Sequence, residues 1–250
     1  MTLIFSPELE LCATAHEQSV IFEDEYRIEE LYSLDKDIEY IADLGANIGS
    51  ASVQFQKFFP NAKILVCEPE PELMKYTKLN TEDKLIYVEE AIIGDDRKEV
   101  TFNICKWQGN HHVDGNFRWD LFAPMGSKKI GEIKVKASTL KDIMDRYEFP
   151  RIDLIKLDTE GMEGQILRAF KPYMDKIKHI RGEWHGDVDR EIIREALKDT
   201  HEIFFDRKLT THGGIFAIRK DFSDASAKVT EYDEYKTIER IGLPVSIQML

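Results

Sequence analysis

Short apolar runs alternate with helical patterns through most of the chain. Runs rich in Ile, Leu, Val and Phe predict strands, whereas apolar residues three and four positions apart predict helices. The predicted strands are 40–44, 63–68, 85–88, 99–104, 133–137, 152–157, 177–185, 201–205 and 213–218, with helices at 48–59, 71–79, 162–170 and 188–197 between them. Another helix follows Ser138 or Thr139, either of which is a suitable N-cap. This alternation predicts an α/β fold whose last two strands pair antiparallel.

The stretch from Tyr40 to Ser50 joins the first apolar run of this series to its helix through a turn with two glycines. Gly45 and Gly49 allow positive φ angles or close approach of a ligand, because no Cβ stands in the way. The helix behind them begins with free N–H groups and a partial positive charge. Glu68 ends the next strand, where an acid accepts hydrogen bonds from both ribose hydroxyls. The pattern predicts a nucleotide or cofactor site.

The residues around these glycines favour one cofactor. A dinucleotide fingerprint has glycine where this chain has Asn47, and Asp43 before the first glycine would repel a pyrophosphate. An acid there suits a ligand that carries a sulfonium and an ammonium group, such as S-adenosylmethionine. Asp158, at the end of strand 152–157, is expected at the same sheet edge, so we expect Asp43, Glu68 and Asp158 to converge around the sulfonium. Ordinary glycine-capped turns, with Asp158 as a helix cap, are the alternative.

The third strand supplies the next candidates. It is followed by Glu90 and Ala91, which would lie where an adenine base could reach the sheet edge. Ala91 would offer an apolar wall, and Glu90 could accept a hydrogen bond from the adenine amino group. Glu90 could equally be a solvated strand end.

Glu183 and His185 lie two positions apart near the end of strand 177–185 and so point to one face. Methyl transfer to an aliphatic hydroxyl needs a base, for which His185 is the first candidate, Glu183 the second and Asp158 the third. His185 could instead be a rim residue without a role. The three side chains could also bind Mg²⁺ or Mn²⁺ and so lower the pKa of the acceptor, although we favour a base without metal.

The domain organisation predicted from these patterns has three parts. Residues 1–37 form an N-terminal cap, with a helical pattern from Tyr26 to Leu34; residues 38–220 form the main domain; residues 221–250 form a tail that could cap the sheet or support a homodimer. The least regular stretch, 105–131, is predicted as an insertion loop that could line an acceptor pocket. The neighbouring His111 and His112 in it are weak evidence for a metal.

Composition narrows the range of partners. The chain has 250 residues and a net charge of −13, with 34 basic and 47 acidic residues. Such an acidic chain is poorly suited to nucleic acid or to an anionic membrane, so a small or neutral substrate is expected. The three cysteines show no metal or disulfide spacing, and neither a basic leader nor an apolar span is present, so we expect a cytoplasmic protein.

Four blocks of the sequence together resemble the FkbM family of S-adenosylmethionine-dependent methyltransferases: Asp43–Gly49, Glu68–Pro69, Glu90–Asp95 and Asp153–Glu163. The last contains D-x-E-G-x-E, which is uncommon in other class I methyltransferases. The resemblance covers about 38–220.

The resemblance implies a class I methyltransferase fold, which is Rossmann-like: a seven-stranded, mostly parallel sheet with helices on both faces and the last strand antiparallel. It implies transfer of a methyl group, most often to a hydroxyl oxygen of a small molecule or sugar, with S-adenosylhomocysteine as the product. Carried over by position, Asp43, Gly45, Asn47 and Gly49 would hold the methionine part and Glu68 the ribose, with Ala46 and Pro69 in the same two turns. A catalytically silent partner subunit is the alternative, and a nicotinamide oxidoreductase a more distant one.

Overall fold

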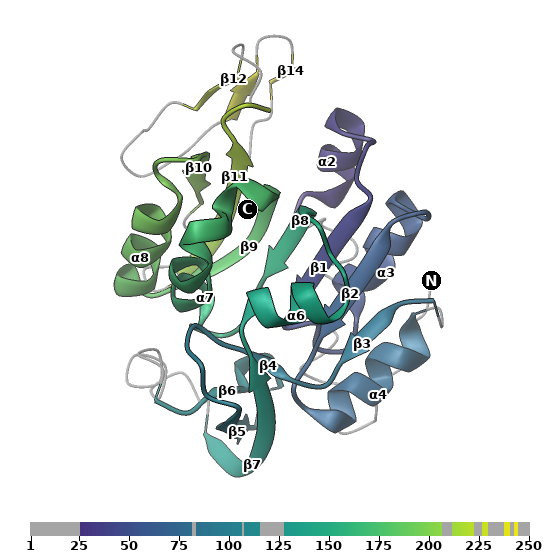
Figure 1. Ribbon diagram of the computed structural model, residues 1–250, viewed down its shortest axis with the longest axis vertical. Helices are drawn as coiled ribbons and strands as arrows, with labels where there is room; N and C mark the ends of the chain where they lie inside the picture. Colours follow the sequence, from purple (N-terminus) through teal and green to yellow (C-terminus); the bar gives the residue numbers. More distant parts are fainter. Residues whose placement is uncertain are drawn as a thin grey trace.

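The computed structural model of this chain describes residues 26–81, 84–106, 108–115, 128–206 and 212–222, together with the backbone of three short strands beyond them (Figure 1). Those three strands, β12 (Ala227–Val229), β13 (Ile238–Arg240) and β14 (Leu243–Pro244), pair antiparallel with one another and fall within the predicted tail.

A seven-stranded sheet forms the centre of the molecule (Figure 1). Its strand order is β10-β11-β9-β8-β1-β2-β3, and β11 runs antiparallel to both of its neighbours while the other neighbouring strands are parallel. The strands are β1 (Tyr40–Leu44), β2 (Lys63–Cys67), β3 (Ile86–Val88), β8 (Ile152–Leu157), β9 (Ile177–His185), β10 (His201–Phe205) and β11 (His212–Arg219). The predicted mostly parallel sheet, with the last strand antiparallel, is therefore confirmed.

Helices cover both faces of this sheet (Figure 1). On one side lie α2 (Ile28–Leu34), α3 (Ser50–Phe58) and α4 (Pro71–Asn80), and on the other lie α6 (Leu140–Arg146), α7 (Glu163–Phe170) and α8 (Asp187–Leu197). The described part of the predicted cap, Tyr26 and α2, packs against α3 and β1 in one of the two cores.

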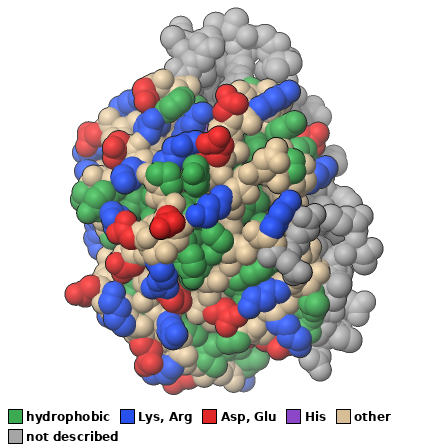
Figure 2. Space-filling model, turned by 45° about the vertical axis from the view of Figure 1, so that its right-hand side comes forward, with side chains coloured by type: hydrophobic (Ala, Val, Ile, Leu, Met, Phe, Trp, Pro, Cys, Tyr) green, Lys and Arg blue, Asp and Glu red, His purple; other side chains and the backbone are tan. Residues whose placement is uncertain are grey.

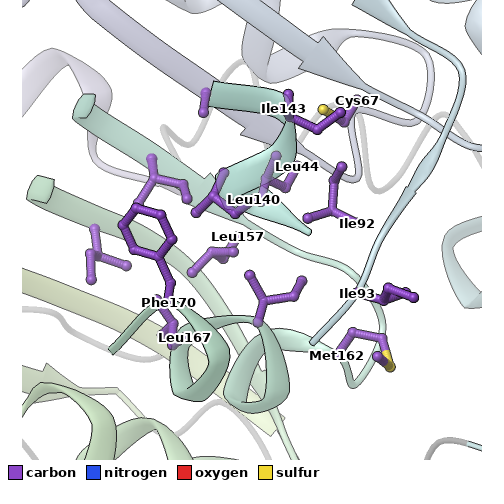
Figure 3. Close-up of a cluster of buried hydrophobic side chains, with 14 of the residues drawn as sticks. Leu44, Cys67, Ile92, Ile93, Leu140, Ile143, Leu157, Met162, Leu167 and Phe170 are labelled. Carbon is purple, nitrogen blue, oxygen red and sulfur yellow. The ribbon is translucent and has the colours of Figure 1, made fainter. Parts of the chain in front are cut away.

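The alternation of side chains along the central strands creates these two cores. In β1, Ile41 faces the core shared with α2 and α3, whereas Ala42 and Leu44 face the core shared with α6, α7 and α8. Figure 3 shows the second core, where Leu44 and Leu157 from the strands lie among apolar side chains of the helices. Each buried side chain of this size stabilises the fold by about 1.5–3 kcal/mol, which anchors the strand ends beneath the site.

A second sheet lies at the lower end of the molecule in Figure 1, between β3 and α6 in the chain. It contains β4 (Ala91–Ile92), β5 (Glu99–Cys105), β6 (His112–Val113) and β7 (Lys129–Ser138), in the order β4-β7-β5-β6. The prediction of an irregular 105–131 is therefore partly wrong, because 105, 112–113 and 129–131 belong to strands and Gln108–Asn110 forms a 3₁₀ turn. Trp107 and residues 116–127 lie outside the described part of the chain.

The strand order reverses between β1 and β8. From β1 the chain moves outward to β2 and β3, whereas β8 is followed by β9 on the opposite side. In open α/β sheets, ligands bind outside the carboxyl ends of the strands at such a reversal. A ligand site is therefore expected among the residues at the carboxyl ends of β1, β2, β8 and β9.

Thr139 is the N-cap of α6. Its hydroxyl accepts a hydrogen bond from the Asp142 N–H at 3.1 Å, and the Asp142 side chain accepts from the Thr139 N–H, which completes a capping box. Of the two predicted caps, Thr139 is the correct one.

Replacement of this cap gives the first testable prediction. Thr139→Ala leaves the Asp142 N–H without its acceptor and should lower the free energy of unfolding by about 1 kcal/mol in urea titrations. Thr139→Ser keeps the hydroxyl and should stay close to the wild type. Equal losses in both variants would contradict the capping role.

Candidate functional site

A cavity of about 350 Å³ lies at the predicted edge of the sheet. The turn after β1 lines it through Gly45 to Asn47, the end of β2 through Glu68, the end of β8 through Asp158, and β9 through Glu183. Tyr26 and residues of the second sheet, including His111, complete the wall. Its size falls within the usual range for small-ligand sites.

The turn after β1 has a conformation that its residues dictate. Gly45 has φ +78°, and a Cβ there would lie 1.8 Å from the carbonyl oxygen of Asp158, so the two strand ends approach more closely than any larger residue allows. Asn47 also has a positive φ, 54°. Gly49 is the N-cap of α3 and helps shape the turn, although it does not line the cavity.

Glu68 is held rigidly at the cavity wall. Its two carboxylate oxygens accept hydrogen bonds from the backbone N–H groups of Asn47 and Glu70, each at 2.9 Å. Burial raises the pKa of Glu68 to about 7, because these hydrogen bonds only partly offset the loss of solvent. Each oxygen keeps a second lone pair, so the carboxylate can accept two further hydrogen bonds from a ligand.

Two polar atoms near Glu68 lack partners among the described residues. They are the side-chain oxygens of Asn47 and Ser50, both buried and both belonging to residues that line the cavity. Buried polar atoms are normally paired, so such atoms at a cavity wall indicate a ligand with hydrogen-bonding groups. The first turn of α3 thus fits the amino-acid part of a cofactor.

A buried lysine connects β1 and β8. Lys156 stands opposite Asp43 in the register of the two strands, and its ammonium nitrogen lies 3.4 Å from Asp43 Oδ1 and 4.0 Å from Asp158 Oδ2. It also donates a hydrogen bond to the carbonyl oxygen of Gly45 at 2.6 Å. Burial would lower the pKa of Lys156, but the two carboxylates outweigh it and raise the pKa, so the lysine stays charged.

Asp43 is not at the cavity, contrary to the prediction. Its side chain is fully buried on the α3 side of the sheet, where it accepts a hydrogen bond from the Ser52 hydroxyl at 2.6 Å and pairs with Lys156. It does not line the cavity. The cation that compensates Asp43 is therefore a lysine of this chain rather than a ligand. Lys156 was not among the predicted site residues, although a lysine inside the apolar run 152–157 requires a buried partner.

Asp158, Glu183 and His185 come together where β8 and β9 reach the cavity. Each offers a ligand atom within 4.8 Å of the other two. His185 Nε2 lies 3.4 Å from Glu183 Oε2 and 4.0 Å from Asp158 Oδ1. Asp158 Oδ2 accepts a hydrogen bond from the Tyr26 hydroxyl at 2.8 Å. Asp158 and Glu183 line the cavity, whereas His185 lies behind them, fully buried.

Glu163 fixes the position of His185. His185 Nδ1 lies 3.1 Å from Glu163 Oε1, and the same carboxylate accepts hydrogen bonds from the N–H groups of Thr159 and Gly161. Burial would raise the pKa of Glu163, but His185 and these donors lower it. The last acid of the D-x-E-G-x-E block thus shapes the turn after β8 and orients the imidazole. The cavity is lined by its first two acids, Asp158 and Glu160.

The two predicted adenine contacts, Ala91 and Glu90, have different environments in the structure. Ala91 lines the cavity as an apolar wall. Glu90 also lines it, but its carboxylate accepts hydrogen bonds from Ser138 and from Arg146. Burial would raise the pKa of Glu90, but these two donors outweigh it and lower the pKa.

His111 and His112 have separate environments. His111 Nδ1 lies 2.7 Å from Glu70 Oε2, which attaches the second sheet to the start of α4 beside Glu68. His112 Nδ1 lies 2.8 Å from the Asn110 carbonyl oxygen. Among the described residues, the side chains that could share a metal are those of Asp158, Glu183 and His185.

A family comparison identifies the chain. The model of the Methyltransferase FkbM domain matches residues 43–205, more than half of the sequence. The chain belongs to the FkbM methyltransferase family. The match begins at Asp43 and contains Glu68, Asp158, Glu183 and His185, so it covers every residue that lines the cavity except Tyr26.

Two curated methyltransferases resemble the chain at 26% identity. They are 2-O-methyltransferase NoeI of Sinorhizobium fredii, with 66% of this chain and 69% of that protein covered, and methyltransferase sdnD of Sordaria araneosa, with 64% and 72% covered. The chain is thus a methyltransferase enzyme.

Solved structures are more distant. A precorrin-6y C5,15-methyltransferase from Geobacter metallireducens has 14% identity and a TM-score of 0.43, with 77% of this chain and 87% of that chain covered. An rRNA methylase from Streptococcus thermophilus has 9% identity and a TM-score of 0.44, with 77% and 93% covered. Both scores lie below 0.5, so neither structure bears on the activity of this chain.

The buried pair of Lys156 and Asp43 gives the second testable prediction. Lys156→Met leaves Asp43 buried without a counter-charge and should lower the free energy of unfolding by about 3–5 kcal/mol in urea titrations. Adding Asp43→Asn should restore much of this loss, because the double variant buries no charge at that position.

Lys141→Met is the matched control, because it removes a lysine from an ion pair at the surface and should leave stability near that of the wild type. A double variant that is less stable than Lys156→Met alone would contradict the pairing.

Proposed function

We propose that this FkbM methyltransferase transfers a methyl group from S-adenosylmethionine to a hydroxyl oxygen of a small molecule or sugar. One observation supports this most directly: a single cavity is lined by an acid suited to a ribose, Glu68, and by two proton-accepting side chains, Asp158 and Glu183, with His185 behind them. The resemblance to a 2-O-methyltransferase agrees with an oxygen acceptor.

The nucleoside end of the cavity consists of Glu68, Pro69 and Ala91. Glu68 accepts hydrogen bonds from the two ribose hydroxyls, which its fixed orientation allows without further ordering. Ala91 and Ile92 present an apolar surface to the adenine. The amino-acid end lies against Asn47 and Ser50, whose free oxygens accept hydrogen bonds from an ammonium group. Bound S-adenosylmethionine supplies a methyl group already activated by a positively charged sulfur.

The protein contributes chiefly positioning. The reaction needs the acceptor oxygen, the methyl carbon and the sulfur in one line. When the protein holds both molecules in this geometry, a bimolecular reaction becomes effectively unimolecular, which lowers the barrier. Asp158 lines the cavity, and its negative charge favours the cationic donor. Tyr26 fixes one of its oxygens through a hydrogen bond at 2.8 Å.

The acceptor hydroxyl must lose its proton as the new carbon–oxygen bond forms, and a positioned base typically accelerates such a step about 10²–10⁴-fold. His185, the first candidate from the sequence, does not reach the cavity. We therefore assign the direct contact with the acceptor to Glu183 and Asp158, with His185 behind them.

The charges around the cavity favour an uncharged acceptor. Its wall includes the acids Glu68, Asp158, Glu160 and Glu183 together with one lysine, Lys156. On the face shown in Figure 2, acidic and basic side chains are interspersed and no continuous basic patch is visible. The negative charges around the cavity would repel a polyanionic acceptor such as nucleic acid. No helix among the described residues is long and apolar enough to cross a membrane.

The ionisation of Glu68 gives a prediction for cofactor binding. Because its pKa is raised to about 7, the carboxyl is mostly protonated below that pH and loses part of its capacity to accept hydrogen bonds. Calorimetry should show that the affinity for S-adenosylhomocysteine is about tenfold weaker at pH 6 than at pH 8, because the ionised fraction of one carboxyl with a pKa of about 7 changes by about that factor.

Glu68→Gln should remove this pH dependence and weaken binding at pH 8 by about 1.5–3 kcal/mol. Glu89→Gln is the matched control, because Glu89 is exposed and pairs with Lys78 at the surface. Unchanged binding in Glu68→Gln would refute the role of Glu68.

The proposed reaction is tested with methyl-labelled S-adenosylmethionine and a panel of neutral sugars and alcohols, each beside its analogue lacking one hydroxyl. We expect one S-adenosylhomocysteine per labelled ether and no label in the matching deoxy compound. Glu183→Gln should lower kcat about 10²-fold or more. Tight binding of S-adenosylhomocysteine without transfer to any hydroxyl would instead favour the silent partner subunit.

A further inference from the structure

We propose that Asp158, Glu183 and His185 bind one divalent cation, with Mn²⁺ preferred over Mg²⁺, and that this cation activates the acceptor hydroxyl. The site comprises two carboxylate oxygens and one imidazole nitrogen from the ends of β8 and β9, all within 4.8 Å of one another. The cation's role in methyl transfer rests on the proposed function, whereas its binding does not.

The register of β8 and β9 creates this convergence. Leu157 pairs with Gly182 in the sheet, so the residues that follow them, Asp158 and Glu183, lie side by side at the cavity. A Cβ on Gly182 would lie 1.9 Å from the Leu157 carbonyl oxygen, so the strands approach closely just before the two acids. Glu183 and His185 then share one face of β9 because they are two residues apart.

The orientation of His185 is already that of a metal ligand. Glu163 Oε1, which lies 3.1 Å from Nδ1, also receives the Thr159 N–H at 2.7 Å and therefore acts as an acceptor. Nδ1 must then carry the ring proton and donate it, which leaves the lone pair of a neutral imidazole on Nε2. Metal-binding histidines are usually fixed in this way, by a carboxylate on the nitrogen that does not bind the metal.

The Nε2 lone pair points toward two more acceptors. The distances from Nε2 to Glu183 Oε2 and Asp158 Oδ1, 3.4 Å and 4.0 Å, exceed the usual length of a hydrogen bond. Oδ1 of Asp158 is buried and has no hydrogen-bond donor among the described residues. The three ligand atoms therefore face one another at distances that a small cation between them can span.

A divalent cation fits this spacing. Ligands at about 2.1 Å from one ion lie about 3.0–3.4 Å from each other in octahedral or tetrahedral geometry, so a small inward movement of Asp158 is sufficient. Lys156 does not occupy this position, because it approaches the other oxygen of Asp158 and lies closer to Asp43.

The ligand set indicates the class of metal. Two carboxylates and one imidazole suit Mn²⁺, whereas Mg²⁺ and Ca²⁺ prefer oxygen ligands alone. Because Asp158 and Glu183 line the cavity, the remaining coordination positions of the ion would face the acceptor. A hydroxyl bound there has a lower pKa, so it loses its proton to water in the cavity. The carbon–oxygen bond then forms as the carbon–sulfur bond breaks, and the sulfonium becomes a neutral thioether.

The test is a titration of the purified, chelator-treated chain with Mn²⁺, followed by the loss of the electron paramagnetic resonance signal of the free ion. We expect one Mn²⁺ per chain, and an affinity lowered about tenfold or more in Asp158→Asn and in Glu183→Gln. Circular dichroism shows whether each variant is folded. If one of the two does not fold, the other still tests the site.

Glu160→Gln is the matched control. It removes one negative charge from the same cavity wall without removing a proposed ligand, so Mn²⁺ affinity should change by about threefold or less. Equal losses in Glu160→Gln and Glu183→Gln would show a diffuse attraction of cations and would overturn the site, as would the absence of binding at millimolar Mn²⁺.

The catalytic role is tested separately. Exhaustive chelation should abolish methyl transfer, and Mn²⁺ should restore it more effectively than Mg²⁺; full activity after chelation would overturn this role. Calorimetry with S-adenosylhomocysteine in the presence of the chelator distinguishes the two proposals, because Glu68 and Asn47 are not among the proposed cation ligands. Failure of S-adenosylhomocysteine to bind would refute the proposed function, whatever the result with Mn²⁺.

Discussion

The buried ammonium group of Lys156 is the interaction on which the site depends. It neutralises Asp43 across the β1–β8 pair, lies near Asp158, and binds the carbonyl oxygen of the turn that follows β1. This is the point at which the strand order reverses, and a fully buried acid such as Asp43 is costly there without a cation. A charge inside the sheet thus fixes the strand ends between which the cavity opens.

The acids around the cavity fall into two groups: those that line the cavity and those that are buried and stabilise neighbouring residues. Glu68, Asp158 and Glu183 line the cavity. Asp43 and Glu163 are fully buried and act on their neighbours, the first through Lys156 and the second through His185 and the turn after β8. Of these five acids, only Glu68, Asp158 and Glu183 can act on a ligand. In the proposed function, Glu68 binds the methyl donor, whereas Asp158 and Glu183 contact the acceptor.

The sequence predicted the sheet well because each central strand is a distinct apolar run, and it placed Glu68, Asp158 and Glu183 correctly because carboxyl ends of parallel strands share one edge. It failed for Asp43, since the face to which a strand residue points depends on pairing: Asp43 stands opposite Lys156, one position before the end of β1. It also missed Tyr26, which reaches Asp158 across 132 positions of sequence. Such contacts arise from tertiary packing and leave no local pattern.

The central claim is that one cavity holds the methyl donor at Glu68 and presents its sulfur to Asp158 and Glu183. A crystal structure of the chain with S-adenosylhomocysteine tests it most directly. The account predicts the ribose hydroxyls on the Glu68 carboxylate, the amino-acid part against Asn47 and Ser50, and the sulfur turned toward Asp158. A ligand bound elsewhere, or bound here with its ribose away from Glu68, would contradict it.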